Sequence, residues 1–220
     1  MEILKLWQGI KTSKCETCKN EDCRGRLVYD NLCSNVNYLK EYGERNYEKN
    51  RDTFMELKKV MGQEKPYIFS FGCGIGLDYL GAVDAFGEKV VYYPIDECNW
   101  AIKDTDNFKN FEPQLPKKAM KLNEALSLLT MMPKTATLCF FNSLFIISDK
   151  VEDFKPKLVR ALKNKSSFHF VCDYTINSNY HLASTEQEFI VELLKELKDF
   201  SFKKIDILDG KGIIIVGKKK

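Results

Sequence analysis

The sequence contains no apolar stretch that approaches the roughly 20 residues a helix needs to cross a bilayer. Its opening stretch, MEILKLWQGIKTS, also lacks the apolar run and the small-residue cleavage site of a secretory signal. Internal repeats and low-complexity segments are absent as well. These absences favour a cytoplasmic globular protein over a membrane, secreted or repeat protein.

The sequence has little excess charge of either sign. Its 34 basic side chains are nearly balanced by 31 acidic ones, which gives a formal net charge of +3, and the two kinds are interspersed. The lysine run 218–220 is compatible with a nucleic-acid contact, although a short charge run is more often a solvated tail. Charge therefore leaves nucleic acid open as a partner without indicating it.

Cysteine is well represented, and four of the eight cysteines fall close together in a polar segment. They have the spacing C-x2-C-x4-C-x9-C and are Cys15, Cys18, Cys23 and Cys33. In a reducing compartment such a cluster indicates a metal site rather than disulfides. We expect a structural zinc ion held by four thiolates, with an iron–sulfur cluster or unliganded thiols as alternatives. The other four resemble free core thiols, one per segment: Cys73, Cys98, Cys139 and Cys172.

The pattern of the chain changes near Pro66. Residues 1–65 combine the cysteine cluster with an expected helix over 36–61 and form a predicted amino-terminal module. Over 66–220, apolar strand-like runs alternate with amphipathic helical patterns, which predicts a doubly wound α/β sheet. Strands are expected at 67–71, 89–95, 135–142 and 167–174, and helices at 77–86, 122–129, 149–162 and 185–200. Two β-rich runs around a glycine turn, 201–208 and 213–216, predict a closing antiparallel hairpin.

Two of the helix starts are predicted from the spacing of a capping box, in which Asp or Thr is followed three residues later by Glu. Asp149 with Glu152 marks the first start, and Thr185 with Glu188 marks the second. The segment 105–118 contains two prolines and leaves room only for a short strand.

The first expected strand runs directly into a glycine-rich turn, Phe71-Gly72-Cys73-Gly74-Ile75-Gly76. Glycine adopts positive φ without steric cost and lets a ligand approach the backbone. The N–H groups that open the following helix can meet a carboxylate. The spacing is G-x-G-x-G, whereas a dinucleotide fingerprint is G-x-G-x-x-G and would place its third glycine at Leu77. The turn therefore predicts a ligand site and counts against a nicotinamide or flavin cofactor.

An acidic residue follows the second expected strand. Asp96 lies twenty residues beyond Gly76. A carboxylate at this strand end can accept hydrogen bonds from both hydroxyls of a ribose. Glu97, the next residue, is the alternative for the same role.

The motif FGCGIG, the acidic strand end in YYPIDE and the closing hairpin together resemble the class I S-adenosylmethionine-dependent methyltransferase family, over residues 67–220. The resemblance implies methyl transfer from a sulfonium donor. It also implies a seven-stranded sheet whose last strand is antiparallel and inserted beside the fifth-strand position. The cofactor-binding residues that it implies are Phe71, Gly72, Cys73, Gly74, Gly76, Asp96, Glu97 and Asn142. The family usually carries an acid two positions before the first glycine, where this sequence has Ser70; the change weakens a contact near the amino group of the methionine end.

The strand expected over 135–142 ends in Asn142-Ser143-Leu144-Phe145. In the family this strand end faces the transferable methyl group, and amine-directed members carry an Asn/Asp-Pro-Pro-aromatic motif there. Only the first and last residues of that motif are present, so an amine acceptor is weakly indicated. In the other interpretation, Asn142 caps the strand and touches the adenine ring.

Methyl transfer depends mainly on alignment, and a base is needed only when the nucleophile holds its proton tightly. Asp173, Tyr174 and His181 follow the next strand and are candidates for the same rim, but no catalytic residue is assigned. A structural or surface role is the alternative for His181. His169, in the middle of a strand, is expected in the core.

Two kinds of function fit these features best, and a third, a different nucleotide-binding enzyme of the doubly wound type, is disfavoured by Leu77 and the hairpin. The first is a methyltransferase whose acceptor, a nucleic acid, a protein or a small molecule, is open. The second is a methyltransferase-like binding or scaffold protein that has lost catalysis, an alternative that Ser70 and the altered motif at Asn142 keep open. Oligomeric state is not indicated.

Overall fold

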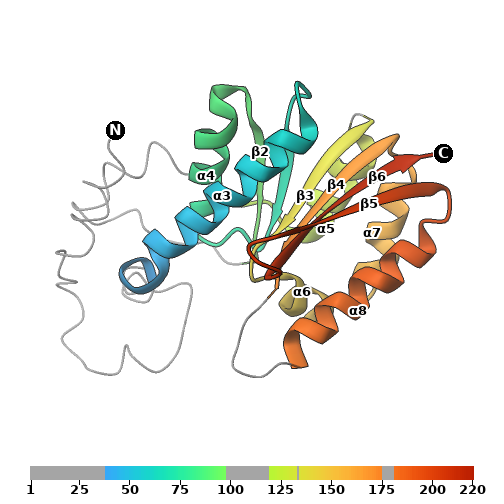
Figure 1. The fold of residues 1–220 in the computed structure, drawn as a ribbon. Coiled ribbons are helices and arrows are strands. Elements are labelled where there is room, and N and C mark those ends of the chain that lie inside the picture. The colour runs from blue at the N-terminus through green and yellow to red at the C-terminus, as the bar shows by residue number, and fades with distance from the viewer. Residues whose placement is uncertain (1–37, 98–118, 133, 175–180) are drawn as a thin grey trace.

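The computed structural model describes residues 38–97, 119–132, 134–174 and 181–220. Within these ranges the chain forms one six-stranded sheet with the order β2-β1-β3-β4-β6-β5 and helices on both faces (Figure 1). Four strands run parallel to one another: β1 (Tyr67–Phe71), β2 (Val91–Ile95), β3 (Thr135–Phe140) and β4 (Ser167–Asp173). The doubly wound α/β architecture is confirmed.

The hairpin closes the sheet as expected. Strand β6 (Gly212–Lys219) lies between β4 and β5 (Phe200–Ile207) and is antiparallel to both. The connecting turn contains Leu208, Asp209 and Gly210, all with positive φ. Insertion of an antiparallel last strand beside β4 is the arrangement that the resemblance implied.

The number of strands differs from the seven expected. Beyond the outer edge of β2, Met120 forms a single parallel bridge with Ile95. Its N–H donates to the carbonyl oxygen of Pro94 at 2.7 Å, and its own carbonyl accepts from the Asp96 N–H at 3.1 Å. Six strands are therefore present in the described ranges, with one bridging residue where a short seventh would lie. The segment 98–118 is outside those ranges.

Successive side chains of a strand point to opposite faces of the sheet, so the strands contribute side chains to two apolar layers. On one face, Ile68, Cys139 and Val171 pack under α3 (Glu44–Met61) and α4 (Leu77–Phe86). The other face is covered by α5 (Leu122–Met131), α7 (Phe154–Lys163) and α8 (His181–Glu196). Because both faces are covered, the parallel strands are almost continuously apolar.

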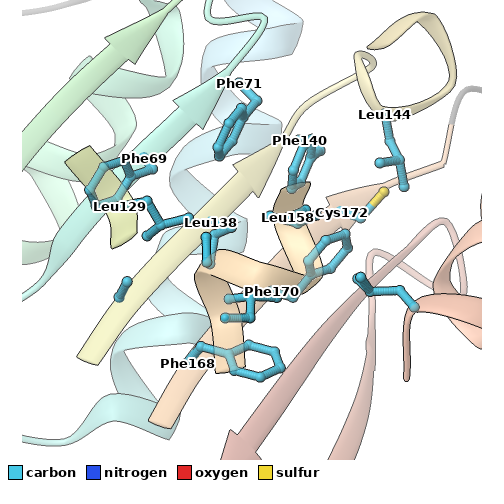
Figure 2. Packing of buried hydrophobic residues seen from close by; sticks show 14 of the residues in the cluster. Phe69, Phe71, Leu129, Leu138, Phe140, Leu144, Leu158, Phe168, Phe170 and Cys172 are labelled. Atoms are coloured by element: carbon cyan, nitrogen blue, oxygen red, sulfur yellow. The ribbon is translucent and has the colours of Figure 1, made fainter. Parts of the chain in front are cut away.

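Stacked aromatic rings run across neighbouring strands in the second layer. Phe71 of β1 stacks on Phe140 of β3 with ring centroids 4.7 Å apart, and Phe140 stacks on Phe170 of β4 at 4.9 Å (Figure 2). All three are almost completely buried. Aromatic pairs in such geometry add about 0.5–1.5 kcal/mol beyond the burial of their area. These contacts link β1, β3 and β4 across the sheet.

Several element boundaries correct the sequence predictions. The short helix α6 (Leu144–Lys150) was not expected, and its first residue, Leu144, is completely buried in the core. Asp149 therefore lies inside α6, and α7 begins at Phe154 after Asp153, which has φ 60°. Helix α8 begins at His181, so Thr185 lies inside it. Neither predicted capping box starts a helix.

Helix α3 and strand β2 also begin later than predicted, because a short turn of another helix type precedes each of them. A π-helical turn, η2 (Leu39–Gly43), precedes α3, and a 3-10 turn, η3 (Gly87–Lys89), delays the start of β2. Of the helices that the structure describes, none is long and apolar enough to cross a membrane. Cys15, Cys18, Cys23 and Cys33 lie outside the described residues, and the boundary near Pro66 stays a prediction.

Candidate functional site

The candidate site lies where the four parallel strands end. The glycine turn follows β1, Asp96 follows β2, Asn142 comes shortly after β3, and Asp173 is the last residue of β4. Ligands of doubly wound sheets bind at this edge, outside the carboxyl ends of the strands. The structure therefore brings the glycine turn, Asp96, Asn142 and Asp173 to one edge of the sheet.

The turn after β1 requires glycine at several positions. Gly72, Gly74 and Gly76 have φ of 69°, 55° and 84°, a region that other residues adopt at a cost. At Gly72 there is also no room for a side chain, since an added Cβ would stand 2.5 Å from the Cβ of Ser143. The N–H groups of Gly72 and Cys73 donate to the carbonyl oxygen of Ile95 at 2.8 and 3.1 Å. The turn is thus fixed against the end of β2.

Asp96 lies against the same turn. Its Oδ2 accepts a hydrogen bond from the Gly74 N–H at 2.8 Å, which ties the acid after β2 to the middle of the turn. Glu97 is exposed, and its carbonyl oxygen accepts from the ammonium of Lys121. The predicted neighbourhood of the turn and Asp96 is therefore present in the structure.

The end of β3 has an unusual backbone. Asn142 has φ 52°, and its N–H donates to the carboxylate of Asp173. Next to it, the Ser143 hydroxyl donates to the carbonyl oxygen of Phe71 at 2.5 Å, which binds the end of β3 to the end of β1. The Phe71 side chain belongs to the core, so only its backbone faces the turn.

Lys49 was missed by the sequence reasoning, although it joins this network from α3. Its ammonium forms an ion pair with Asp173 and donates to Oδ1 of Asn142 at 3.4 Å. Burial raises the pKa of the Asp173 carboxyl, while the charge of Lys49 acts in the opposite direction. No local signal marks a lysine in the middle of an amphipathic helix, because its partner is set by how the helix packs.

A second buried carboxylate, also missed, lies next to the turn in the first turn of α4. Oδ2 of Asp78 accepts from the Tyr92 hydroxyl at 2.7 Å, and the Ser70 hydroxyl donates to the same carboxylate. Asp78 is only 3% exposed. Burial raises its pKa to about 6, against the effect of these hydrogen bonds. Ser70, at the position where the family carries an acid, thus contacts an acid supplied by α4.

Burial favours the neutral forms of Cys73, Cys139, Cys172 and His169. Burial raises the pKa of the Cys73 thiol, which disfavours a reactive thiolate. Cys139 and Cys172 are free and buried, as expected for core thiols, whereas Cys98 lies outside the described residues. His169 is buried, which confirms its place in the core, and this burial lowers its pKa to about 4. His181 is the first residue of α8, and Tyr174 is buried.

No group of three or more His, Cys, Asp or Glu side chains within the described ranges is arranged to hold a metal ion. The clustered amino-terminal cysteines are outside those ranges. The zinc site stays a prediction.

Comparison with solved structures shows the class of the fold. A provisionally assigned S-adenosyl-L-methionine-dependent methyltransferase from Methanococcus maripaludis matches with a TM-score of 0.52 and 14% identity, over 90% of this chain and 96% of that one. A provisionally assigned caffeoyl-CoA O-methyltransferase from Staphylococcus aureus matches with a TM-score of 0.51 and 15% identity, over 83% and 91%. The chain spans 61% of the length of the pyocyanin biosynthetic protein PhzM and matches it over 84% of its own length, with a TM-score of 0.46 and 15% identity.

No protein-family model matches the sequence, and no curated protein matches it. The structural matches establish that the chain has the Rossmann-like fold of the class I S-adenosylmethionine-dependent methyltransferases. The resemblance recognised in the sequence is confirmed at the level of the fold. A shared fold does not by itself define a reaction.

Proposed function

We propose that this protein is an S-adenosylmethionine-dependent methyltransferase. The observation that carries the proposal is the hydrogen bond from the Gly74 N–H to the Asp96 carboxylate. It joins a glycine turn to an acid at the carboxyl edge of a parallel sheet, where a nucleoside and its charged tail can bind together. The methyltransferase fold of the chain supports the same function.

The residues at the edge fit this cofactor. The glycines of the turn let its methionine end approach the backbone, and Asp96 offers carboxylate oxygens to the ribose hydroxyls. Glu97 is the alternative at the ribose, and Asn142 lies at the strand end beside the turn. When bound, the cofactor supplies a methyl group on a sulfonium, which is already a good leaving group. The protein then has chiefly to align the acceptor with that methyl group.

The acceptor is open between a nucleic acid, a protein and a small molecule. Oδ1 of Asn142 faces the ammonium of Lys49. An amine acceptor would have to displace Lys49 in order to donate to the same oxygen. This contact therefore also disfavours an amine acceptor. Asp173 is engaged by Lys49 and by the Asn142 backbone, so we assign it to positioning the strand end rather than to proton transfer.

Calorimetric titration with S-adenosylmethionine and S-adenosylhomocysteine tests the proposal. We expect wild-type protein to bind both, and Asp96→Ala to weaken both about tenfold or more, because hydrogen bonds to a charged group are lost. Asp52→Ala, an exposed acid on α3, is the matched control and should bind normally. If wild-type protein does not bind at millimolar cofactor, the methyltransferase proposal is wrong. If Asp96→Ala binds normally, the ribose role is wrong.

We further propose that the four amino-terminal cysteines bind a structural zinc ion. The close spacing of Cys15, Cys18, Cys23 and Cys33 supports this proposal. Metal analysis of the purified protein should find about one zinc per chain, since four thiolates complete one tetrahedral site. Cys18→Ser should lose that zinc and Cys139→Ser should keep it. Iron in place of zinc would favour the cluster, and the absence of metal would favour free thiols.

A further inference from the structure

We infer that Asp78 and Asn50 form a site for the primary ammonium group of the bound ligand, next to the glycine turn. The inference rests on the proposed function, because the ligand that it concerns is the methionine end of S-adenosylmethionine. It assigns two residues that neither the glycine motif nor the fold marks. Their burial, charge and hydrogen-bonding state carry the argument.

Asp78 is a buried anion, and no cation pairs with it in the part of the chain that the structure describes. It lies in the first turn of α4, two residues after Gly76, and its neighbours are the hydroxyls of Ser70 and Tyr92 and nearby backbone N–H groups. No basic side chain of the described segments forms an ion pair with it. A buried charge is costly unless it is paired. A cationic ligand at the adjacent turn would supply the missing charge.

Asn50 offers a second acceptor from α3. It is 4% exposed, and its Oδ1 has no hydrogen-bond partner among the described residues. Buried polar atoms in native proteins nearly always have a partner, so an orphan acceptor points to a missing donor. A primary ammonium has three N–H donors and can satisfy both acceptors at once.

Helix packing brings these two residues to the same region. A Cβ added to Gly81 would stand 3.0 Å from the carbonyl carbon of Asn50, so α3 and α4 cross in close contact there. Gly81 is three residues after Asp78 and therefore lies on the same side of α4. On α3, Asn50 continues the buried row of Phe54, Leu57 and Met61 by one turn. Phe54 packs against Phe141, just beyond β3, so the row reaches the edge that carries the site.

The charges of S-adenosylmethionine indicate which of its ends lies near Asp96 and which lies near Asp78. S-adenosylmethionine carries a fixed positive charge on sulfur and a second one on its α-ammonium. The Asp96 carboxylate accepts a hydrogen bond from the Gly74 N–H, in the middle of the turn, whereas Asp78 comes after the last glycine of the turn. The ribose and the amino-acid end can therefore occupy the two ends of the turn. We assign Asp96 to the first and the Asp78–Asn50 pair to the second.

Two commercial probes separate this role from a general effect on binding. S-adenosylhomocysteine contains the α-ammonium, and 5′-methylthioadenosine has the same nucleoside and thioether without the amino-acid end. We would measure the dissociation constants of both for wild-type protein, Asp78→Asn and Asn50→Leu. Each variant should weaken S-adenosylhomocysteine about tenfold and change 5′-methylthioadenosine less than about twofold, since only the former presents the ammonium.

Thr53→Val is the matched control, because Thr53 is also on α3 and its buried hydroxyl also has no hydrogen-bond partner among the described residues. It should leave both constants unchanged. Equal weakening of the two probes, or no weakening in either variant, would overturn the inference. If Asp78→Asn does not fold, Asn50→Leu decides, because it removes the unpartnered Oδ1 and puts an apolar group of similar size in its place. Failure of wild-type protein to bind either probe would instead overturn the proposed function itself.

Discussion

Lys49 on α3 forms an ion pair with Asp173, the last residue of β4. The two side chains differ sharply in burial, at 27% exposed for the lysine and 1% for the aspartate. The lysine also reaches Oδ1 of Asn142, and the aspartate accepts the Asn142 N–H. One pair of charges therefore anchors the helix to the strand ends and holds Asn142 at its positive φ.

Removing Lys49 should destabilise the protein, because it leaves the carboxylate of Asp173 buried without its cation. We expect Lys49→Met to lower the free energy of unfolding by about 2 kcal/mol at pH 7, measured by urea denaturation. Adding Asp173→Asn should restore part of this loss. Lys59→Met is the matched control on the same helix, where the exposed pair with Glu56 is worth at most about 0.5 kcal/mol. Equal effects at the two lysines would show that the ion pair is not stabilising.

Alanine at Gly72 should be far more harmful than alanine at Gly87. Both glycines have φ near 70°, so both substitutions add about 1–2 kcal/mol of backbone strain. At Gly72 the new Cβ also meets Ser143 at 2.5 Å, whereas no atom lies within 4 Å at Gly87. We expect the Gly72 variant to lose about 2 kcal/mol more in urea denaturation, from overpacking at a fixed strand end. Similar losses would mean that the turn can move away from Ser143.

Much of the fold was predictable because its signals are local. Continuous apolar runs marked the four parallel strands, and the two β-rich runs around a glycine turn marked the hairpin. The contact between the turn and Asp96 was also predictable, since parallel strands bring their carboxyl ends to one edge. The capping-box predictions at Asp149 and Thr185 failed because the same residue spacing is compatible with a helix interior, and α6 and α8 begin earlier.

The unpredicted part of the site depends on long-range packing. Lys49 and Asn50 are neighbours on α3, yet Lys49 contacts Asp173 and Asn142 whereas Asn50 lies against α4. These contacts depend on how α3 packs and not on the local sequence. In the sequence, Asp78 is an acid in the first turn of an expected helix, a position that the helix dipole favours and that does not mark a ligand site. Its burial against Ser70 and Tyr92 follows from the pairing of β1 with β2.

Asp78 should make the protein less stable as the pH rises from 4 to 7. Its pKa is about 6 in the folded protein and 3.8 for the free side chain, so the folded state binds the proton more tightly in this range. By linkage, its contribution to stability is greatest near pH 4 and is lost as the pH rises through 6, by about 3 kcal/mol in total. Asp78→Asn should remove this slope in urea denaturation at several pH values. The exposed Asp52→Asn should retain it; a wild-type slope in Asp78→Asn would contradict the assignment.

His169 should act in the opposite direction over nearly the same range. Burial, together with the charge of Lys218 on the neighbouring strand, lowers its pKa from 6.5 to about 4, so the folded protein keeps the imidazole neutral. Its Nδ1 is buried without a hydrogen-bond partner among the described residues, which is consistent with a ring that gains nothing from protonation. The unfolded chain takes up a proton below pH 6.5, and stability is lost as the pH falls towards 4, by about 3 kcal/mol.

The two effects are best separated by measuring His169→Leu in the Asp78→Asn background. In the Asp78→Asn single variant, the free energy of unfolding measured in urea should decrease as the pH falls from 7 to 4. The added leucine should remove most of this acid sensitivity, because it fills the same apolar layer without a titrating group. It should also raise stability near pH 4 relative to the single variant. An unchanged pH dependence would mean that His169 is protonated in the folded protein. Water or a negatively charged group would then have to reach its imidazole between β4 and the helices that cover it.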